Sequence, residues 1–462
     1  MVHQREVLKK IWNKDYHILA HDVGTGKTKV LCDLIRYRLS VVNSGNTSGV
    51  LIICPKSVMQ NWKNELEKHT RIGRHAIVIS GTPALKAKQL GTIDKQIFII
   101  NYDALGSVMK ILEKMNFEMI VFDELHLLKS HKSDRSKYCQ RLSKNAKRRF
   151  GLTGTMILNN LMDVFAQALV IDHGVTFGIN FFEFRARYFT DKNKHWAGKP
   201  NYFPKWEVKP GAEALVQKKL ETLVDRRTKD ECLDLPEVVF ERRYCELMPE
   251  QAKRYEEIRK ELITIIHDQG VSVAKTALTR DLRLNQVTSG HLTMDNGEVY
   301  SFEDNAKLSL LKSILFDELS DRKVIIWAVF RQDIENIRRL VQSLDLASAC
   351  IFGDTSQEDR QNEIDNFQNQ AECKIFIGNP ASAGTGITLT ASDVAIFYSY
   401  NYNLGNYLQA LGRNHRKGSE IHKSITYIHL VAKGTIDEAI VEGLERKEDL
   451  ADRVMNNIRR ID

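Results

Sequence analysis

The chain has 462 residues, more than one ordinary hydrophobic core accommodates, so we expect at least two domains. Hydrophobic residues make up 43% and charged residues 27%, and no run of about 18 apolar residues or secretory signal is present, which excludes a disordered chain and disfavours a membrane or secreted protein. The formal net charge of +8 is compatible with a polyanionic partner but does not require one.

The first third of the chain predicts one α/β domain. Residues 17–20 form an expected strand that leads into a glycine-rich loop, and residues 27–39 have the spacing of a helix. More apolar, β-branched runs follow between helical patterns, at residues 50–54, 76–79, 97–100 and 119–122. Short strands separated by helices predict a parallel sheet with helices on both faces, here lobe 1 over residues 1–171.

The rest of the chain divides into four expected parts. Residues 172–235 are interpreted as a helical insertion and the junction between lobes, and residues 236–300 as the start of lobe 2 with a further helical insertion. Strand patterns return in residues 301–434, the body of lobe 2, and residues 435–462 predict a C-terminal helix that packs on the lobes. The fold class is therefore α/β, with two parallel-sheet lobes and helical insertions between them.

Residues 21–28, with the sequence HDVGTGKT, have the composition of a phosphate-binding loop. Gly24 and Gly26 allow the backbone around Thr25 to wrap a phosphate and to aim its N–H groups inward, at the positive end of the following helix. Lys27 can reach the outer phosphates of a nucleotide, and the Thr28 hydroxyl can bind Mg²⁺. An accidental glycine loop is the alternative, which the preceding strand and following helix disfavour.

The strand at 119–122 ends in a pair of carboxylates. Asp123 can hold Mg²⁺ and Glu124 can orient or deprotonate an attacking water, while His126 can contact the γ-phosphate or the next motif. Thr153 and Thr155 flank a glycine after the next expected strand, which suits a hinge that senses nucleotide. Each short motif alone would be weak, since acids and turns at strand ends are common.

The last third offers a second phosphate-binding loop and two arginines. Residues 383–389 are small, and their backbone amides can grip a phosphate of ATP or of a nucleic acid, although a tight turn explains the same pattern. Arg413 and Arg416 are three residues apart, which places both guanidinium groups on one face of an expected helix. Arginine stays charged and forks onto phosphate oxygens, so this pair suits the stabilisation of a leaving phosphate.

Taken in order, these motifs resemble the Swi/Snf branch of the superfamily 2 helicase-like ATPases. That branch carries D-E-x-G-x-G-K-T, D-E-x-H, L-T-G-T-P-x-x-N and Q-x-x-G-R-x-x-R, which match residues 21–28, 123–126, 152–159 and 409–416. Two departures are His21, where the family has Asp, and Met156, where it has Pro. Neither removes a phosphate-contacting group. No accessory domain is visible, so a minimal motor similar to annealing-helicase and branch-migration relatives is expected.

The resemblance implies two RecA-like lobes, ATP and Mg²⁺ as cofactors, and roles for further residues. Gln4 would read the adenine edge, and Gln409 and Gly386 would complete the ATP site. His126, Thr153 and Thr155 would couple that site to DNA. The implied DNA contacts are Lys56, Ser57, Asn101, Tyr102, Phe330, Arg331, Ser382 and Thr385. For Tyr102 and Phe330, a place in the hydrophobic core is an equal alternative.

The function implied is that of a DNA-dependent ATPase that moves along double-stranded or branched DNA as a monomer, for branch migration, strand annealing or protein displacement. A strand-separating DNA or RNA helicase is the first alternative. An ATP-regulated nucleic-acid-binding module without processive movement is the second. An intracellular location is expected, in the cytoplasm of a bacterial or virus-infected cell or in a nucleus, while protein partners are not indicated.

Overall fold

The computed structural model describes residues 1–41, 49–92, 96–199, 202–268, 273–294, 296–353, 355–383, 387–456 and 458. It divides the chain into two compact units. The first unit comprises Met1–Ala197, Pro204–Leu233 and Lys447–Asp462, and the second comprises Gly198–Phe203 and Asp234–Arg446. The finer division into five parts stays a prediction.

The first unit is built on a seven-stranded sheet in which every pair of neighbours is parallel. The order across the sheet is β3 (Ala76–Val78), β4 (Ile97–Asn101), β2 (Val50–Cys54), β5 (Phe117–Phe122), β6 (Ala146–Thr153), β1 (Tyr16–His21) and β9 (Val224–Arg227). Because parallel strands end at the same edge, the loops after β5, β6 and β1 lie next to one another. This edge carries the predicted motifs.

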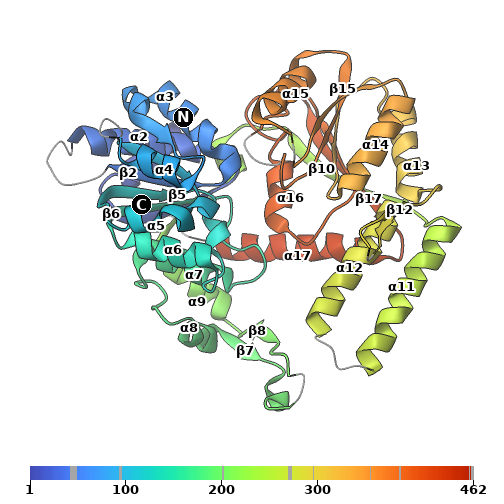
Figure 1. Ribbon diagram of the computed structural model, residues 1–462, viewed down its shortest axis with the longest axis horizontal. Coiled ribbons are helices and arrows are strands. Elements are labelled where there is room, and N and C mark those ends of the chain that lie inside the picture. Colours follow the sequence, from blue (N-terminus) through green and yellow to red (C-terminus); the bar gives the residue numbers. More distant parts are fainter. Residues whose placement is uncertain are drawn as a thin grey trace. The chain divides into compact units, whose positions relative to one another are not determined.

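Helices cover both faces of this sheet (Figure 1). One face packs against α1 (Val2–Ile11), α2 (Lys27–Val41) and α3 (Met59–His69) through side chains such as Ile52 and Trp62. The other packs through side chains such as Ile53 against helices that include α5 (Leu105–Leu112), α6 (Asp134–Ser143), α7 (Asp163–Asp172), α8 (Phe181–Tyr188) and α9 (Ala212–Leu220). Adjacent residues of β2 therefore enter different cores, which is why this strand is apolar throughout.

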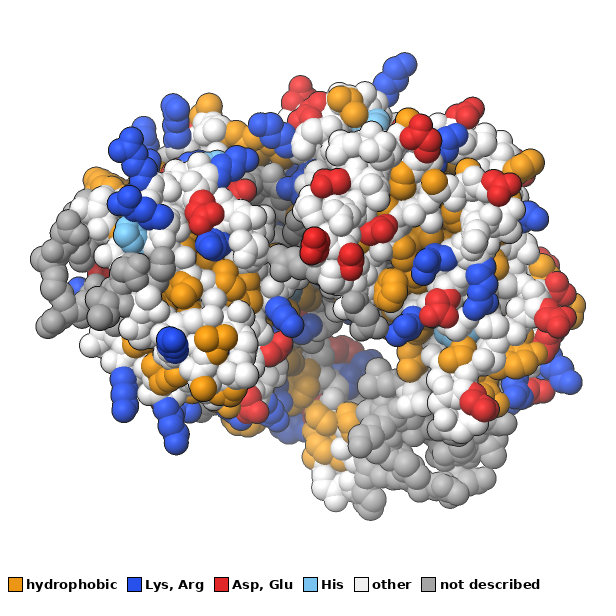
Figure 2. All heavy atoms as spheres, turned by 45° about the horizontal axis from the view of Figure 1, so that its top comes forward, with side chains coloured by type: hydrophobic (Ala, Val, Ile, Leu, Met, Phe, Trp, Pro, Cys, Tyr) orange, Lys and Arg blue, Asp and Glu red, His pale blue; other side chains and the backbone are white. Residues whose placement is uncertain are grey.

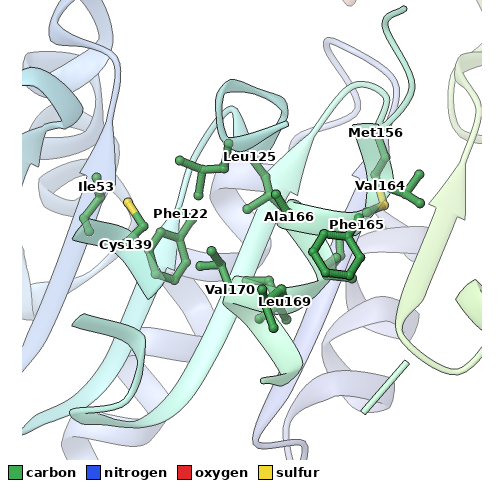
Figure 3. Close-up of a cluster of buried hydrophobic side chains, with 14 of the residues drawn as sticks. Ile53, Phe122, Leu125, Cys139, Met156, Val164, Phe165, Ala166, Leu169 and Val170 are labelled. Carbon is green, nitrogen blue, oxygen red and sulfur yellow. The ribbon is translucent and has the colours of Figure 1, made fainter. Parts of the chain in front are cut away.

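Figure 3 shows part of the second of these cores, where β5, α6 and α7 meet. Phe122 at the end of β5 and Leu125 in the following turn lie beside Val170 of α7. Met156 lies at the other end of the cluster with Val164 and is fully buried. The apolar side chain at position 156 therefore anchors the loop after β6 in the core.

The second unit is built on a six-stranded parallel sheet. The order is β10 (Glu237–Cys245), β17 (Ser424–Ala432), β16 (Val394–Phe397), β13 (Val324–Trp327), β15 (Cys373–Gly378) and β14 (Ala347–Ile351). One face packs on α13 (Ala306–Ser313), the π-helical turn η6 (Ile314–Glu318) and α14 (Arg331–Ser343). The other carries aromatic contacts to α15 (Gln357–Asn369) and α16 (Leu404–Leu411), with ring centroids 5.5 Å apart for Phe367 and Phe376 and 5.1 Å apart for Phe397 and Tyr407.

Several smaller elements add to the two layered lobes. The second unit has a helical pair, α11 (Pro249–Asp268) and α12 (Val273–Ser289), and a short hairpin of β11 (His291–Thr293) and β12 (Val299–Ser301). The first unit has α4 (Pro83–Leu90), the single turn α10 (Lys229–Cys232) and a hairpin of β7 (Phe189–Asp191) and β8 (Trp206–Val208). Helix α17 (Ile436–Met455) begins in the second unit and ends in the first.

The predicted α/β class with two parallel-sheet lobes is confirmed. The middle third, interpreted from the sequence as helical, also contains the β7–β8 and β11–β12 hairpins and the edge strands β9 and β10. Across the described residues, no helix combines the length and the apolar character that a membrane crossing requires.

Candidate nucleotide and DNA sites

The glycine-rich loop joins β1 to α2 at the shared edge of the first sheet. Gly24 and Gly26 have φ angles of 95° and 83°, a backbone conformation that side chains with a Cβ rarely adopt. A Cβ on Gly26 would lie 2.1 Å from Nε2 of Gln4, and Nε2 of His3 lies 2.9 Å from the carbonyl oxygen of Thr25. Helix α1 thus contacts this loop through two successive side chains, and the nucleotide contact of Gln4 stays a prediction.

Lys27 begins α2, and its ammonium group lies inside the loop. Nζ donates to the carbonyl oxygens of His21 at 2.7 Å and of Asp22 at 3.1 Å. Burial lowers the pKa of Lys27, against the carboxylates of Glu124 and Asp123, which raise it. The charges of the lysine and of both acids therefore interact at this edge of the sheet.

Asp123 and Glu124 follow β5 directly. Asp123 accepts hydrogen bonds from the Trp62 indole at 2.7 Å and from the backbone N–H of Glu124 at 2.9 Å. Burial and the neighbouring Glu124 carboxylate raise the pKa of Asp123 to about 6. The carboxylates of Asp123 and Glu124 follow β5, and the hydroxyl of Thr28 lies at the start of α2 after β1, at the same edge of the sheet. Oxygen donors of these kinds are suited to Mg²⁺.

Glu124 has a left-handed backbone, with φ 50° and ψ 52°. This conformation costs a residue other than glycine on the order of 1–3 kcal/mol, and such strain is concentrated at functional sites. Nδ1 of His126 lies 3.2 Å from the Glu124 carboxylate and 3.3 Å from the hydroxyl of Thr153. Thr153 in turn donates to the carbonyl oxygen of Thr155 at 2.6 Å. The three predicted coupling residues therefore form one chain of contacts that starts at Glu124.

His21, the departure without an explanation in the sequence, points away from the loop. It is 1% exposed, and its Nε2 lies 2.8 Å from Oδ2 of Asp225 on the neighbouring strand β9. Lys10 of α1 donates to the other Asp225 oxygen at 2.9 Å. Burial lowers the pKa of His21 to about 4, although Asp225 raises it, so the imidazole is neutral at pH 7 and donates to the carboxylate. His21 therefore fastens the base of the loop to β9.

Arg226 is a residue of this site that the motif search missed. Its Nη1 lies 2.6 Å from Oδ1 of Asp22 and donates to the carbonyl oxygens of Ala20 at 3.0 Å and Gly154 at 3.2 Å. It therefore holds the end of β1, the glycine-rich loop and the loop after β6 together. The basic pair at 226–227 is visible in the sequence, but it lies within residues 172–235, interpreted as insertion and junction, and nothing in its local pattern indicates these contacts.

In the second unit, Arg413 and Arg416 converge on one carbonyl group. Nη1 of Arg413 donates to the Ile387 oxygen at 3.1 Å, and Nη1 of Arg416 donates to the same atom at 2.9 Å. The expectation of one helical face is wrong, because α16 ends at Leu411 and Gly412 is its C-cap. Gln409 lies in the last turn of α16 and is 7% exposed. Thr385 and Gly386 lie outside the described residues.

The predicted DNA contacts of the first unit lie after two adjacent strands. Lys56 and Ser57 are exposed in η1 (Lys56–Val58), and Asn101 ends β4, paired in register with Cys54 of β2. Tyr102 differs, because it is 3% exposed and donates through its hydroxyl to the carbonyl oxygen of Asp123 at 2.7 Å. Tyr102 therefore lies in the hydrophobic core, the alternative to a DNA contact, and its hydroxyl supports the backbone of the acid pair.

The predicted DNA contacts of the second unit lie after β13 and β15, which are neighbours. Phe330 is half-buried with its ring 5.2 Å from that of His291, while Arg331 is exposed. Ser382 is half-buried in the loop after β15, and Asn379 ties that loop to the other by donating to the carbonyl oxygen of Val329 at 2.6 Å.

Charge is divided unequally between the units. The first unit contains 42 Lys and Arg against 27 Asp and Glu, a net charge of +15, and the second contains 25 against 32, a net charge of −7. Figure 2 agrees, since basic side chains predominate over acidic ones on the visible face of the unit at left. The modest total of +8 therefore hides a strongly basic first unit.

A phosphate-binding lobe with a paired acid motif, followed by a second parallel-sheet lobe with paired arginines, defines a helicase-type ATPase. Residues 3–291 match the SNF2-related domain, and residues 306–418 match the helicase conserved C-terminal domain. The chain belongs to the SNF2-related family of ATP-dependent helicase-type enzymes, which confirms the resemblance seen in the sequence.

Several known proteins are similar to the chain. An uncharacterized ATP-dependent helicase of Mycoplasma genitalium is 26% identical over 447 residues, which cover 95% of this chain and 40% of that protein. A second relative is the SWI/SNF-related matrix-associated actin-dependent regulator of chromatin subfamily A-like protein 1 homolog of Caenorhabditis elegans. It is 28% identical over 445 residues, which cover 95% of this chain and 59% of that protein. The solved Sulfolobus solfataricus SWI2/SNF2 ATPase core in complex with dsDNA is 24% identical, covers 98% of this chain and 92% of that chain, and has a TM-score of 0.44. The chain thus spans 40% of the length of the first of these relatives and 59% of the length of the second.

Proposed function

We propose that the chain is an ATP-driven translocase on double-stranded DNA. The proposal is carried by one observation: Lys27, the Asp123–Glu124 pair and the His126–Thr153 contact lie together at one edge of the first sheet. The net charge of +15 on the same unit supports a polyanionic partner.

Each residue of the site has a defined part in the proposed cycle. Backbone N–H groups around Gly24 and Gly26 bind phosphate, and Lys27 exchanges its carbonyl partners for phosphate oxygens. Mg²⁺, held by Thr28 and Asp123, supplies positive charge that neutralises the phosphates. Glu124, aimed by its left-handed backbone, orients the attacking water and accepts its proton.

The second lobe completes the proposed chemistry. Arg413 and Arg416 stabilise the charge that develops on the leaving phosphate, where a fixed guanidinium is most effective. We propose that they exchange the Ile387 carbonyl for phosphate oxygens during turnover, and that Gln409 and Gly386 assist them.

A change in the bound nucleotide would alter the DNA contacts through the chain of side chains that starts at Glu124. His126, Thr153 and Thr155 would shift when the γ-phosphate leaves. Lys56, Ser57 and Asn101 in lobe 1, and Phe330, Arg331, Ser382 and Thr385 in lobe 2, would hold the DNA backbone. Phosphate contacts carry no sequence information, so binding is expected to be independent of sequence and sensitive to salt.

Steady-state ATP hydrolysis with and without blunt duplex DNA tests the proposal. We expect strong stimulation by duplex, and loss of hydrolysis in Lys27→Ala and Glu124→Gln with duplex affinity largely retained. Lys29→Ala is the matched control, because Lys29 lies on the same helix and pairs with Asp33. Equal rates with and without DNA, or full activity in Lys27→Ala, would contradict the assignment.

Movement is tested separately from hydrolysis. A translocase is expected to displace the third strand of a DNA triplex without separating a forked duplex. Separation of the forked duplex would instead support a strand-separating helicase. Hydrolysis without displacement on any of these substrates, or on four-way junctions, would support an ATP-regulated binding module.

A further inference from the structure

The hairpin of β7 and β8 forms its own two-stranded sheet, apart from the seven-stranded sheet of the first unit. Its register pairs Phe189 with Val208, Thr190 with Glu207 and Asp191 with Trp206. In Figure 1 it extends away from the sheet beyond α8 (green). We define the basic hairpin as residues 185–197 and 204–209. The proposed cycle assigns no task to it.

The base of the basic hairpin is fixed in the core of the first unit. Tyr188 and Phe189 are each 3% exposed, and the rings of Phe184 and Tyr188 lie 5.1 Å apart. The Lys209 backbone N–H donates to the Tyr188 carbonyl oxygen at 2.9 Å, which ties the two ends of the hairpin together. Because the hairpin is anchored at its base, it loses little conformational entropy when it binds a ligand.

The charge of the basic hairpin is concentrated and largely exposed. It contains six Lys and Arg residues against two acidic ones, so 19 residues carry +4, half of the net charge of the whole chain. Lys192 and Lys205 are 57% and 66% exposed at their side chains, and both lie near the single carboxylate of Glu207, at 3.7 Å and 3.2 Å. One exposed carboxylate cannot neutralise two lysines, so the surface keeps a positive potential.

Aromatic rings accompany these charges. Trp196 is 51% exposed in η5 (Lys194–Trp196), and its ring lies 5.4 Å from that of His195. The guanidinium of Arg185 lies 4.0 Å from the Trp206 ring and holds it in place. A large exposed indole among lysines is the combination that stacks on bases while binding the phosphates between them.

The chemistry distinguishes the possible partners. Duplex DNA offers phosphates, but its bases are stacked inside and present no open face to the Trp196 ring. An acidic protein would pair with the lysines but would not supply the planar base faces on which an indole stacks. An unpaired strand offers phosphates and open base faces together, and base stacking on an aromatic side chain contributes about 1–3 kcal/mol per base.

We propose that the basic hairpin binds the single-stranded arm of a DNA junction, with bases stacked on Trp196 and phosphates held by Lys192, Lys194 and Lys205. The inference rests on the proposed function, since it adds a single-stranded arm to the double-stranded DNA on which the translocase acts. Through this contact the protein would distinguish the end of a duplex from its interior.

The test compares duplexes of equal length with and without a single-stranded tail, by fluorescence anisotropy. We expect Trp196→Ala to weaken binding of the tailed duplex about tenfold and to leave binding of blunt duplex and the ATPase rate on blunt duplex unchanged. Trp12→Ala is the matched control, because Trp12 is a 47% exposed tryptophan at the end of α1. Lys192→Ala with Lys205→Ala should lower the salt dependence for the tailed duplex, whereas Lys137→Ala, 57% exposed on α6, should not.

Replacing the tail with an abasic strand separates stacking from charge. The wild-type protein should bind the abasic tail as weakly as Trp196→Ala binds the normal tail. Equal losses on blunt and tailed duplex, no loss in Trp196→Ala, or full affinity for the abasic tail would each overturn the proposal. An RNA tail that binds better than a DNA tail would overturn the choice of DNA. Failure of the translocase assignment would be seen independently, as absent stimulation of the wild-type ATPase by blunt duplex.

Discussion

At the scale of single residues, His21 shows how a departure from a family motif acquires a physical reason. The buried imidazole of His21 stands where the family has a carboxylate, and its Nε2 lies 2.8 Å from the Asp225 carboxylate. A carboxylate at position 21 would face that of Asp225 in the same buried site, and two buried like charges repel, so acids at positions 21 and 225 disfavour each other. The substitution belongs to the contact with β9 and leaves the phosphate loop intact.

The burial of His21 beside Asp225 predicts that the free energy of unfolding depends on pH. Burial lowers the pKa of His21 to about 4 and that of His17, on the same strand, to about 3, both from 6.5. The unfolded chain therefore binds protons that the folded chain does not, and the stability present above pH 6.5 is lost as the pH falls from 6.5 toward 4. For His21 the full effect is on the order of 3 kcal/mol.

Urea unfolding of the first unit at pH 5 and pH 7.5 measures this loss. His21→Asn keeps a donor to Asp225 and removes the titrating ring, so the difference between the two pH values should shrink. His69→Asn is the control, because His69 is a partly exposed surface residue paired with Glu65. An unchanged pH difference in His21→Asn would contradict this account.

Arg226 leads to a second prediction at this scale. Its guanidinium holds Asp22, Ala20 and Gly154 at once, so Arg226→Ala releases the glycine-rich loop from the loop after β6. We expect kcat/KM for ATP hydrolysis to fall about 10- to 100-fold, equivalent to about 1.4–2.8 kcal/mol. Arg226→Lys should recover only part of the lost kcat/KM, because an ammonium group lacks the forked donors of a guanidinium, which reach several acceptors at once. Exposed Lys218→Ala on α9 should match the wild type in the same assay.

At the scale of elements, apolar strands such as β2 were recognisable in the sequence, including β3 at the edge of its sheet, whereas the charged edge strands β9 and β10 were not. Strands β1, β2 and β5 are buried on both faces, so each contains a continuous apolar run, at residues 18–20, 50–54 and 119–122. β9 has the sequence VDRR and β10 the sequence EVVFERRYC, whose charges concealed them. An edge strand pairs on one side only, and its charged side chains reach solvent or partners such as His21.

The candidate site divides in the same way between what sequence could and could not predict. Lys27, Asp123 and Glu124 lie within short motifs whose spacing alone implies their chemistry. Arg226 acts through a contact between distant segments, and no local pattern specifies it. The paired arginines were expected on one helical face, but Gly412 ends α16 before them, and their convergence depends on Ile387, far away in sequence.

Helix α1 leads to a prediction at this scale. It contacts the glycine-rich loop through His3 and Gln4, and His3 is 7% exposed. His3→Ala removes the hydrogen bond to the Thr25 carbonyl and should loosen the loop, seen as faster amide hydrogen exchange in residues 22–28. Lys9→Ala, at an exposed position of the same helix, should leave exchange there unchanged. Equal exchange in both variants would show that α1 does not restrain the loop.

At the scale of the whole molecule, the unequal charge of the two units is the main finding that total composition conceals. A unit with a net charge of +15 attracts a DNA backbone, and one with −7 repels it. Long-range attraction to DNA is therefore expected to come from the first unit, while the second contributes short-range contacts from single residues such as Arg331.

Duplex affinity as a function of salt tests this division. For B-form DNA each neutralised phosphate contributes about −0.9 to the slope of log affinity against log salt concentration. Lys56→Ala, at the exposed edge of the first sheet, should reduce the slope by about that amount and weaken binding most at low salt. Exposed Lys147→Ala, at the opposite end of that sheet near the start of β6, should change affinity little, because it lies away from the strand ends that carry the predicted contacts. If both substitutions reduced the slope equally, DNA would be held by the diffuse charge of the unit, and the predicted backbone contacts at the carboxyl edge would have to be abandoned.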